Sequence, residues 1–551
     1  MIKNKTADNK KYNEFMNWDN LLLLLRQSSF GQVKNIGGIR GSSPADSEGS
    51  DGSSPANLNG IQRAESVNAG DEGLAGDYQR ILLSASFRRL QDKTQVFPLD
   101  SSDFVRTRLT HSLEVSSLAK RLGEMVGRLL GDMADQFVTP TSSQKAIISD
   151  LLLCAGLIHD IGNPPFGHYG ETTIRLWFRQ HLPKLTFKGC PLISVLSAAM
   201  REDLYNFDGN AQGLRVLTKL HFSAEGWGLN LPFSLLHILM KYPVSSLEVN
   251  SAAADITRHK LGYFMAEKDI FSKLINNLGT GIKVGRGVNL AESEAASDNQ
   301  LTFLANMAIP RACRHPLTFL LEAADDIAYR TADIEDAFKK NKFNFDLLYK
   351  ELRNFNSKNK YGYSEEQCDG YTELVKRLQM ERRLASARKL PESDLYALQK
   401  WLDFLRDVLA KTVAKNFVVN YMAIMSGQWQ SELSTGTIAD PVLSALGTIA
   451  YKYVFHSRQI IKLELAANSI IGGLLDLFVP ACVNFDTEEA LDPVQQRLID
   501  IISDNYIQCY RRCSRGRPES EKLYLRLLLV TDYISGMTDG YAKNLLNQLR
   551  G

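Results

Sequence analysis

Helical periodicity runs from about Asp77 to the C-terminus and limits the fold of this chain more than any other feature. Apolar residues recur there at the three- and four-residue spacing of a buried helix face. Runs with the alternating pattern of a strand are rare. The glycine-rich stretch 279–289 reads as a loop or a short hairpin, because no strand–glycine–helix pattern surrounds it. The sequence therefore predicts an all-α fold.

Changes in composition divide the chain into three parts. Residues 1–76 form an N-terminal lead-in with a Gly-, Ser-, Asp- and Pro-rich insertion at about 36–60. Such a segment has little apolar surface to bury and is typical of a flexible loop. We expect a core at 77–345, interrupted by a second insertion around 279–300. We expect 346–551 to be a helical region packed on that core rather than a separate domain.

The charge balance and the cysteines exclude several classes of protein. The chain has 64 basic and 62 acidic residues, a net charge of +2, so it does not indicate nucleic acid as its main partner. The 7 cysteines are odd in number and widely spaced, and no CxxC pair occurs. A zinc ribbon and a disulfide framework are therefore not expected, and a reducing compartment is favoured.

The N-terminus gives the expected location. Residues 1–20 are polar and lack the apolar segment of a signal peptide, and the leucine run at 21–25 is short. A membrane helix needs about 20 apolar residues, and we find no stretch that approaches this length. We expect a cytoplasmic protein with no membrane partner.

Three histidines lie in sequence contexts that favour metal chemistry. His111 lies in an Arg-Thr-Arg-Leu-Thr-His-Ser segment that begins at Arg106. His159 and Asp160 end an apolar helical run, where an ionised aspartate without a partner would be costly. A divalent metal would satisfy both side chains, and imidazole plus carboxylate suits Mn, Fe, Co, Ni, Zn or Mg-like ions. The alternative is a polar helix end whose His and Asp face solvent.

The third histidine begins a new helix after a sharp break. Gly and Pro residues between 162 and 167 end the preceding helix. His168 and Glu171 are three residues apart and share a face of the first turn. A glutamate so placed can orient the imidazole and raise its basicity, which is typical of a general acid–base pair. A surface pair without function is the alternative interpretation.

A further acidic stripe lies downstream. Asp325, Tyr329 and Asp333 recur every four residues and so fall on one side of a helix. Asp326 and Arg330 form a separate pair at the same spacing, consistent with a solvated salt bridge. Two acids and a tyrosine beside an apolar face indicate a polar pocket, whereas an ordinary amphipathic helix is the competing interpretation.

Together these residues resemble the HD superfamily of metal phosphohydrolases, with its His…His-Asp…Asp pattern on a helical scaffold. The resemblance is closer to the dGTP triphosphohydrolase family. The matching stretches occur in the family's order over most of residues 77–545, and they are 88–99, 106–112, 159–171, 207–212, 316–336 and 532–539. The resemblance implies an HD-domain helical scaffold with additional peripheral helices.

The resemblance also implies the catalytic roles. His111, His159, Asp160 and Asp325 would bind a divalent metal, with Mn²⁺ or Mg²⁺ expected first and Fe, Co, Ni or Zn as alternatives. Asp325 and Asp326 are adjacent, and we choose Asp325 as the ligand because it keeps the family's spacing to Tyr329 and Asp333. The catalytic dyad would be His168 and Glu171. The implied reaction is hydrolysis of dGTP, or another dNTP, to the deoxynucleoside and tripolyphosphate.

Substrate contacts are implied in the same way. Gln95 and Asp333 would hydrogen-bond the deoxyribose 3′-hydroxyl, and Tyr329 would exclude a 2′-hydroxyl. Arg106 would hold phosphate oxygens, and Asn210 would line the pocket. Lys260 would contact the triphosphate, with Lys241 and Lys268 as rivals.

Other family properties are expectations about partners. Relatives form hexamers or similar rings, and some bind single-stranded DNA, so the resemblance implies a homo-oligomer and single-stranded DNA as a regulator. A basic cluster at Arg511, Arg512, Arg515 and Arg517 could meet nucleic acid, a phosphate site or a subunit interface. A solvated loop is the simpler interpretation, because no aromatic residues interleave with it.

Two other functions compete with this reading. One is a different HD phosphohydrolase, a 5′-nucleotidase or a phosphodiesterase, which would share the metal ligands but not the sugar-reading residues. The other is a non-catalytic HD protein that senses nucleotides or single-stranded DNA. The presence of His168, Glu171 and all four metal ligands argues against a sensor, because binding alone does not need the dyad.

Overall fold

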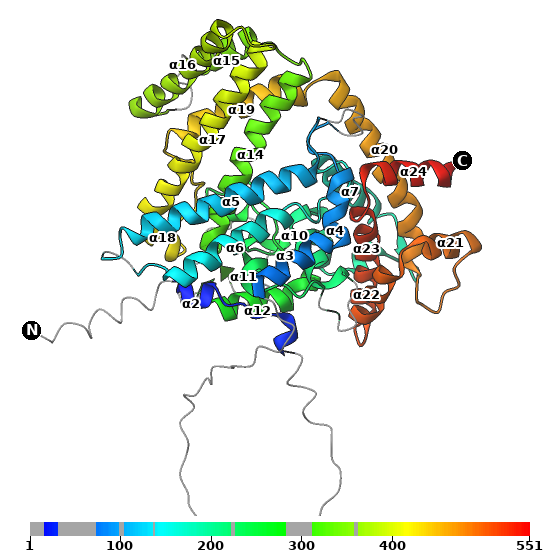
Figure 1. The fold of residues 1–551 in the computed structure, drawn as a ribbon. Coiled ribbons are helices and arrows are strands. Elements are labelled where there is room, and N and C mark those ends of the chain that lie inside the picture. Colours follow the sequence, from blue (N-terminus) through cyan, green and yellow to red (C-terminus); the bar gives the residue numbers. More distant parts are fainter. Residues whose placement is uncertain are drawn as a thin grey trace, which may run out of the picture.

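The fold is built almost entirely from helices (Figure 1). The computed structural model describes residues 16–30, 73–97, 104–135, 138–221, 226, 228–282, 311–356 and 362–551. Within these residues the strands form two short antiparallel pairs, β1 (Thr186–Phe187) with β2 (Cys190–Pro191) and β3 (Gly281–Ile282) with β4 (Arg311–Ala312). The prediction of an all-α fold is confirmed. The insertion expected at 36–60, and residues 283–300 of the second one, lie outside the described residues.

Three long helices form the centre of the molecule. They are α5 (Arg108–Gly131), α6 (Ser142–Ile158) and α14 (Pro316–Lys339), and each packs against the other two (Figure 1). The closest approach of α5 and α6 needs a glycine, because a Cβ on Gly156 would lie 2.4 Å from the Cα of Ser116. The tight packing of α5, α6 and α14 brings segments more than 200 residues apart into one polar cluster.

Local sequence signals start each of these helices. Thr107 and Thr141 form capping boxes with the third residue of α5 and α6. His315 accepts a hydrogen bond from the amide of Leu317 at the start of α14, and Pro316 occupies its first position. The caps place the start of α5 and α14 at fixed points of the chain.

The connection from α6 to α7 (His168–His181) is a tight turn over residues 159–167. Gly162 has φ +109°, and a Cβ there would lie 2.2 Å from the amide of Gly213, which belongs to α10 (Gly209–Arg215). The glycine therefore lets α10 pack directly on the turn. As a result, α6, α7 and α10 converge at one place.

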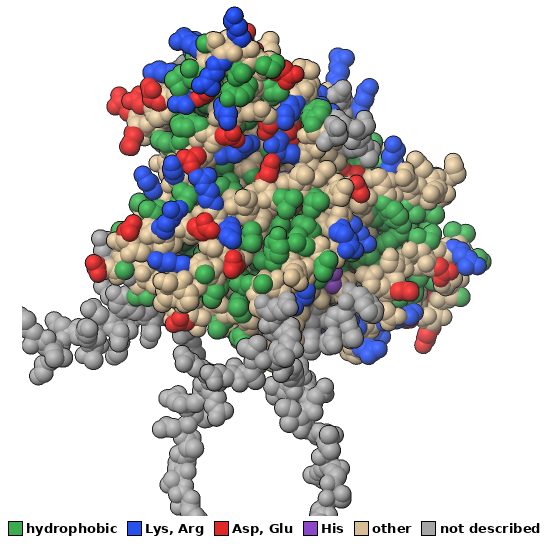
Figure 2. Space-filling model, viewed as in Figure 1, with side chains coloured by type: hydrophobic (Ala, Val, Ile, Leu, Met, Phe, Trp, Pro, Cys, Tyr) green, Lys and Arg blue, Asp and Glu red, His purple; other side chains and the backbone are tan. Residues whose placement is uncertain are grey.

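Helices beyond residue 345 pack on this centre from two sides. On one side α17 (Ser393–Val419) contacts α5 and α14, and α16 (Glu365–Ala387) runs beside it. These helices form the upper part of Figure 1 together with α15 (Phe345–Asn356) and α19 (Ala439–Ala450). Figure 2 shows basic and acidic side chains interspersed over this part, so the visible face carries no extended surface of one charge.

The other side is formed by the last five helices, which are α20 (Arg458–Val483), α21 (Pro493–Ile501), α22 (Asp504–Ser514), α23 (Glu519–Ser535) and α24 (Asp539–Arg550). Within α20, residues Ile460–Val483 are long and apolar enough to cross a membrane, so the expectation that no stretch approaches this length was wrong. The helix packs against α7, α21, α23 and α24, and 61% of its most apolar window is buried. Its apolar character is that of a core helix.

Shorter elements complete the described structure. They are α2 (Trp18–Leu21), η2 (Gln27–Phe30), α3 (Gly73–Leu83), α4 (Ala85–Arg88), η4 (Arg89–Asp92), α8 (Leu192–Val195), α9 (Ala198–Tyr205), η5 (Val216–Leu220), α11 (Phe233–Ile238), η6 (Ser246–Glu248), η7 (Ile256–Arg258), η8 (Met265–Glu267), α12 (Lys268–Leu278), α18 (Tyr421–Met425) and η10 (Tyr451–Phe455).

Candidate active site

His159 lies at the end of α6. One of its ring nitrogens makes a hydrogen bond and the other makes none. Its Nδ1 donates to the carbonyl of Gly156 at 2.8 Å, which fixes the tautomer because a carbonyl only accepts. Its Nε2 is buried and has no hydrogen-bond partner. A buried nitrogen without a partner costs free energy, whereas a neutral imidazole nitrogen in this state is an ordinary metal ligand.

His111 and Asp325 bring α5 and α14 to the same point. The Nε2 of His111 lies 3.0 Å from Oδ1 of Asp325, and the Nε2 of His159 lies 3.5 Å from the same oxygen. The two imidazole rings meet edge to face with centroids 5.3 Å apart. One ligand atom each from His111, His159 and Asp160 lies within 4.8 Å of the others. The structure therefore brings all four predicted metal ligands together.

Two cations flank the carboxylates of this cluster. Arg108 lies 2.8 Å from Oδ2 of Asp160, and the Nζ of Lys241 lies 2.9 Å from Oδ2 of Asp325. Burial opposes ionisation of Asp160, but Arg108 and the two histidines outweigh it and lower its pKa to about 2. The pKa of Asp325 is also lowered, because Lys241 and His159 outweigh the effect of burial.

The donor set fits a divalent metal. Two imidazoles and two ionised carboxylates converge from three helices, and the Nε2 of His159 and the Nδ1 of His111 have no hydrogen-bond partner. Mixed nitrogen and oxygen ligands of this kind suit first-row divalent ions and Mg²⁺ rather than a thiolate-bound metal. The four residues could hold one such ion and leave coordination positions for other ligands.

His168 and Glu171 form a contact at the start of α7. The Nδ1 of His168 donates to Oε2 of Glu171 at 3.1 Å, so Nε2 is left to accept or release a proton. The histidine side chain is 77% exposed and Glu171 only 1%. An exposed imidazole can exchange a proton with a bound ligand, and the buried carboxylate keeps the orientation of the imidazole ring constant.

Glu171 is held by three donors. Its oxygens accept hydrogen bonds from His168, from Arg175 at 2.9 Å and from the backbone amide of Gly209 at 2.8 Å. Burial opposes its ionisation, but the bond from His168 and the charges of His168, Lys260 and Arg175 lower its pKa to about 2. Glu171 therefore stays ionised at neutral pH and keeps the proton on Nδ1 of His168.

The low pKa of Glu171 predicts a pH-dependent contribution to stability. A carboxylate whose pKa falls from 4.5 to about 2 on folding stabilises the fold above pH 4.5, and the contribution is lost as the pH falls through 2. Glu171→Gln should therefore lower the free energy of unfolding at pH 7 by about 2–4 kcal/mol. Urea unfolding at pH 7 and pH 3 measures the difference, which should shrink at the lower pH. The exposed Glu124, replaced by Gln, is the control; a deficit of equal size at both pH values would contradict the argument.

Asp208, Asn210 and Lys260 lie beside the dyad. Asp208 caps α10, and its Oδ1 accepts from the backbone amide and the side chain of Asn210 at 2.9 and 2.7 Å. Its Oδ2 lies 2.9 Å from the Nζ of Lys260. Asn210 and His159 line the same small cavity, so α10 connects the dyad with the metal cluster. Of the three candidate lysines, Lys260 and Lys241 lie at this site.

Tyr329 and Asp333 lie one and two turns beyond Asp325 on α14. The ring of Tyr329 meets that of His111 edge to face with centroids 6.3 Å apart. Burial and the charge of Asp336 raise the pKa of Asp333. Asp333 is buried with Oδ2 unsatisfied, and the carboxamide oxygen of Gln95 is buried without a partner as well. Unsatisfied groups of this kind are available to a ligand hydroxyl.

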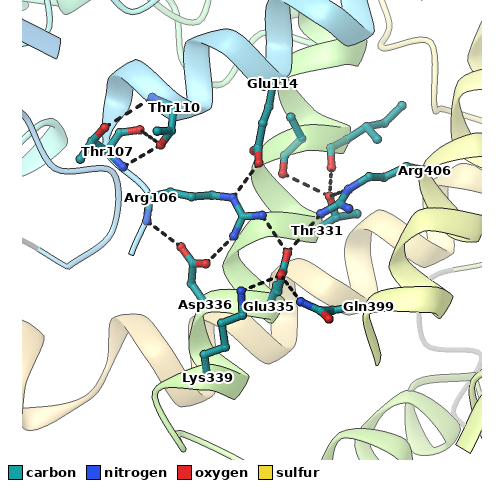
Figure 3. A network of polar contacts seen from close by, with 12 residues as sticks. Arg106, Thr107, Thr110, Glu114, Thr331, Glu335, Asp336, Lys339, Gln399 and Arg406 are labelled. Atoms are coloured by element: carbon teal, nitrogen blue, oxygen red, sulfur yellow. Dashed lines mark hydrogen bonds and ion pairs between the residues drawn. The ribbon is translucent and has the colours of Figure 1, made fainter. Parts of the chain in front are cut away.

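Arg106 is a predicted substrate residue whose guanidinium is fully engaged by other side chains. Figure 3 shows its guanidinium surrounded by three carboxylates. It contacts Glu114 at 2.9 Å, Glu335 at 2.7 Å and Asp336. A phosphate could reach these N–H groups only by displacing the ion pairs. Glu335 and Asp336 belong to α14, so Arg106 joins the start of α5 to the helix that carries Asp325.

Arg108 is the residue that sequence reasoning missed. It lies in the same motif as Arg106 but points to Asp160 and is nearly fully buried. Gly167 leaves room for it, because a Cβ there would lie 2.4 Å from a guanidinium nitrogen of Arg108. The only signal in the sequence was the repeated arginine at 106 and 108, and spacing does not distinguish which of the two faces the cluster.

Comparisons with known proteins agree with this geometry. A family profile described as the HD domain matches residues 108–190. A protein of Listeria monocytogenes named deoxyguanosinetriphosphate triphosphohydrolase-like is 42% identical over 496 residues, covering 89% of this chain and 96% of the relative. A protein of the same name from Synechocystis is 33% identical, covering 86% and 93%. A deoxyguanosinetriphosphate triphosphohydrolase of Klebsiella pneumoniae is 31% identical over 502 residues, covering 85% and 91%.

Proposed function

We infer that this chain, which belongs to the deoxyguanosinetriphosphate triphosphohydrolase family of HD-domain phosphohydrolases, hydrolyses dGTP to deoxyguanosine and tripolyphosphate. Other dNTPs are further substrates in this proposal. The observation that supports it is the convergence of two histidines and two ionised carboxylates on one point, with the exposed His168 and the buried Glu171 beside them. A site that only bound nucleotides would not need a proton-transfer pair.

The metal would be held by His111, His159, Asp160 and Asp325. We propose Mn²⁺ or Mg²⁺, with Fe, Co, Ni and Zn as ions of similar ligand preference. When bound, the ion would supply positive charge to the reacting phosphate and activate water. Lys241 and Arg108 keep the two carboxylates ionised, and therefore ready to bind a cation, at neutral pH. Arg106 is a positioning residue in this proposal, because it fixes α5 against α14.

His168 would carry the proton in the reaction. Its Nδ1 is held by Glu171, so Nε2 would take the proton from the attacking water or give it to the departing 5′-oxygen. The water's oxygen forms the new bond to phosphorus, and the bond from phosphorus to the 5′-oxygen breaks. Lys260 and Asn210 would hold the triphosphate from α10 and its neighbouring loop.

The deoxyribose would be recognised by Gln95, Tyr329 and Asp333. The two unsatisfied groups, on Gln95 and Asp333, would meet the 3′-hydroxyl. The ring of Tyr329 would occupy the space that a 2′-hydroxyl needs.

Removal of the Tyr329 ring should relax the choice of sugar. For Tyr329→Ala we expect the ratio of kcat/KM for dGTP over GTP to fall by about tenfold or more, because the variant loses a steric contact. Steady-state kinetics with both nucleotides measures the ratio. Tyr329→Phe keeps the ring and should keep the discrimination. An unchanged ratio in Tyr329→Ala would exclude this role.

Product analysis tests the proposed function as a whole. The purified chain is incubated with each dNTP and with GTP in Mn²⁺ or Mg²⁺, beside the double variant His159→Ala/Asp160→Ala. Deoxyguanosine and intact tripolyphosphate, formed from dGTP first and absent with the variant, are expected. Equal cleavage of all four dNTPs would support the proposed reaction and contradict the preference for dGTP. Release of pyrophosphate or single phosphate would indicate a 5′-nucleotidase or phosphodiesterase, and no turnover would favour a sensor.

Assembly, regulation and location rest on the family relationship alone. We propose a cytoplasmic homo-oligomer, a hexamer or a similar assembly, with single-stranded DNA as a regulator. Analytical ultracentrifugation with and without an oligonucleotide measures both the assembly and its response.

A further inference from the structure

The stretch 532–539 is one of those that resemble the family, and the proposed function gives it no role. It forms the end of α23, the corner that follows and the first residue of α24, which is Asp539. Asp539 is only 2% exposed. A buried carboxylate needs hydrogen-bond donors, so its partners show what this corner of the fold holds in place.

The carboxylate of Asp539 joins two segments of the candidate active site. Its Oδ2 accepts hydrogen bonds from the backbone amide of Thr94 at 3.1 Å and from the hydroxyl of the same residue at 2.5 Å. Its Oδ1 accepts from the backbone amide of Phe166 at 2.9 Å. Thr94 precedes Gln95, and Phe166 lies two residues before His168. One buried carboxylate therefore holds both the segment that carries Gln95 and the turn that leads to His168.

The conformation of that turn depends on such contacts. Phe166 has φ +62°, a left-handed backbone conformation that a residue with a side chain seldom adopts. A conformation of this kind persists only where the surrounding structure holds it. Without Asp539 the buried amide of Phe166 would lose its hydrogen bond, which costs free energy. The place of His168, two residues further on, therefore depends on Asp539.

Lys93 connects the same parts of the fold a second time. Its buried Nζ donates to the backbone carbonyls of Asn163 and Ser535, both at 2.6 Å. Its own carbonyl accepts a hydrogen bond from the amide of Arg108, at the start of α5, at 3.0 Å. Because these bonds do not involve Asp539, a change at Asp539 should displace the segment that carries Gln95 rather than unfold it.

We propose that Asp539 is a positioning residue that sets the distance between Gln95, the ligand of the 3′-hydroxyl, and His168, the group that moves the proton. This inference rests on the proposed function of Gln95 and His168. A sugar anchored at its 3′-hydroxyl presents its 5′-oxygen at a fixed place, so the anchor contributes to kcat only while the two segments keep their spacing. Asp539 acts on that spacing through Thr94 and Phe166.

The test compares dGTP with 2′,3′-dideoxyGTP, which lacks the 3′-hydroxyl. The side-chain nitrogen of Asp539→Asn cannot accept a hydrogen bond, so the bond to the amide of Thr94 or of Phe166 is lost with almost no change of shape. We expect the ratio of kcat for dGTP over kcat for the dideoxy analogue to fall about tenfold or more, because a displacement of about 1 Å can cost about 10²-fold in rate. A general loss of active protein would lower both rates equally and leave the ratio unchanged.

Three further variants accompany Asp539→Asn. Asp504 is the exposed first residue of α22, so Asp504→Asn is the matched control and should keep the wild-type ratio. In a Gln95→Ala background, Asp539→Asn should not lower the ratio further, because the group that it positions is absent. Thr94→Ala removes only the hydroxyl contact and should lower the ratio by less than Asp539→Asn does. Circular dichroism melting verifies that each variant is folded.

An unchanged ratio in folded Asp539→Asn overturns the proposal, and so does a further fall of the ratio in the Gln95→Ala background. If Asp539→Asn does not fold, an unchanged ratio in Thr94→Ala overturns it. Absence of hydrolysis by the wild type would instead contradict the proposed function, and no variant is needed to observe it. The ratio of the two dissociation constants, measured in Ca²⁺, then replaces the ratio of kcat, and equal values for Asp539→Asn and the wild type overturn the positioning of Gln95.

Discussion

Replacement of His159 by alanine is expected to abolish metal-dependent hydrolysis. The Nε2 of His159 is buried without a hydrogen-bond partner, and it lies 3.5 Å from the Asp325 oxygen that also meets His111. A metal ion contributes several kcal/mol of transition-state stabilisation, which corresponds to a loss of about 10³-fold or more in kcat/KM. The measurement is steady-state turnover of dGTP together with the metal content of the purified protein.

The control for His159 is a histidine of the same chain outside the cluster. His456 is exposed, and its Nδ1 lies 3.1 Å from the carbonyl of Tyr451, far in sequence from every predicted ligand. His456→Ala should keep both activity and metal. Loss of activity in His159→Ala with undiminished metal binding would contradict the ligand role. Wild-type turnover by His159→Ala, in buffers with the same metal concentration, would also contradict this role.

The second large effect is expected at His168. Because the imidazole is 77% exposed, His168→Gln should leave the fold intact while removing the group that moves the proton. Loss of a positioned acid–base group costs on the order of 10²–10⁴ in rate. We expect kcat to fall by this amount while the metal content stays at its wild-type value and the variant remains folded.

The readouts distinguish chemistry from binding. Direct titration of the variant with dGTP in Ca²⁺, which favours binding without turnover, should give a Kd close to that of the wild type. His181→Gln, on the same helix and 34% exposed, is the matched control and should keep full activity. A loss in His168→Gln that appeared only in KM would indicate a binding role instead of proton transfer.

The sequence by itself determined the features that depend on neighbouring residues. The period of apolar residues predicted an all-α fold, since a helix buries one face at a fixed local spacing. The Gly–Pro break before His168 predicted a new helix, and the three-residue step to Glu171 predicted their contact, which the structure has at 3.1 Å. Each of these signals is contained within one or two turns of chain.

Only the tertiary structure decided the features made by distant segments. His111 and Asp325 are separated by 214 residues and meet because α5 packs on α14. Arg106 and Arg108 are two residues apart, yet Arg106 is bound by carboxylates of α14 and Arg108 by Asp160. The basic cluster near residue 512 became a cavity wall only because α12, more than 230 residues earlier in the chain, lies opposite. The physical reason is that the direction of a side chain follows from local spacing, whereas the charge it meets depends on which helices pack together.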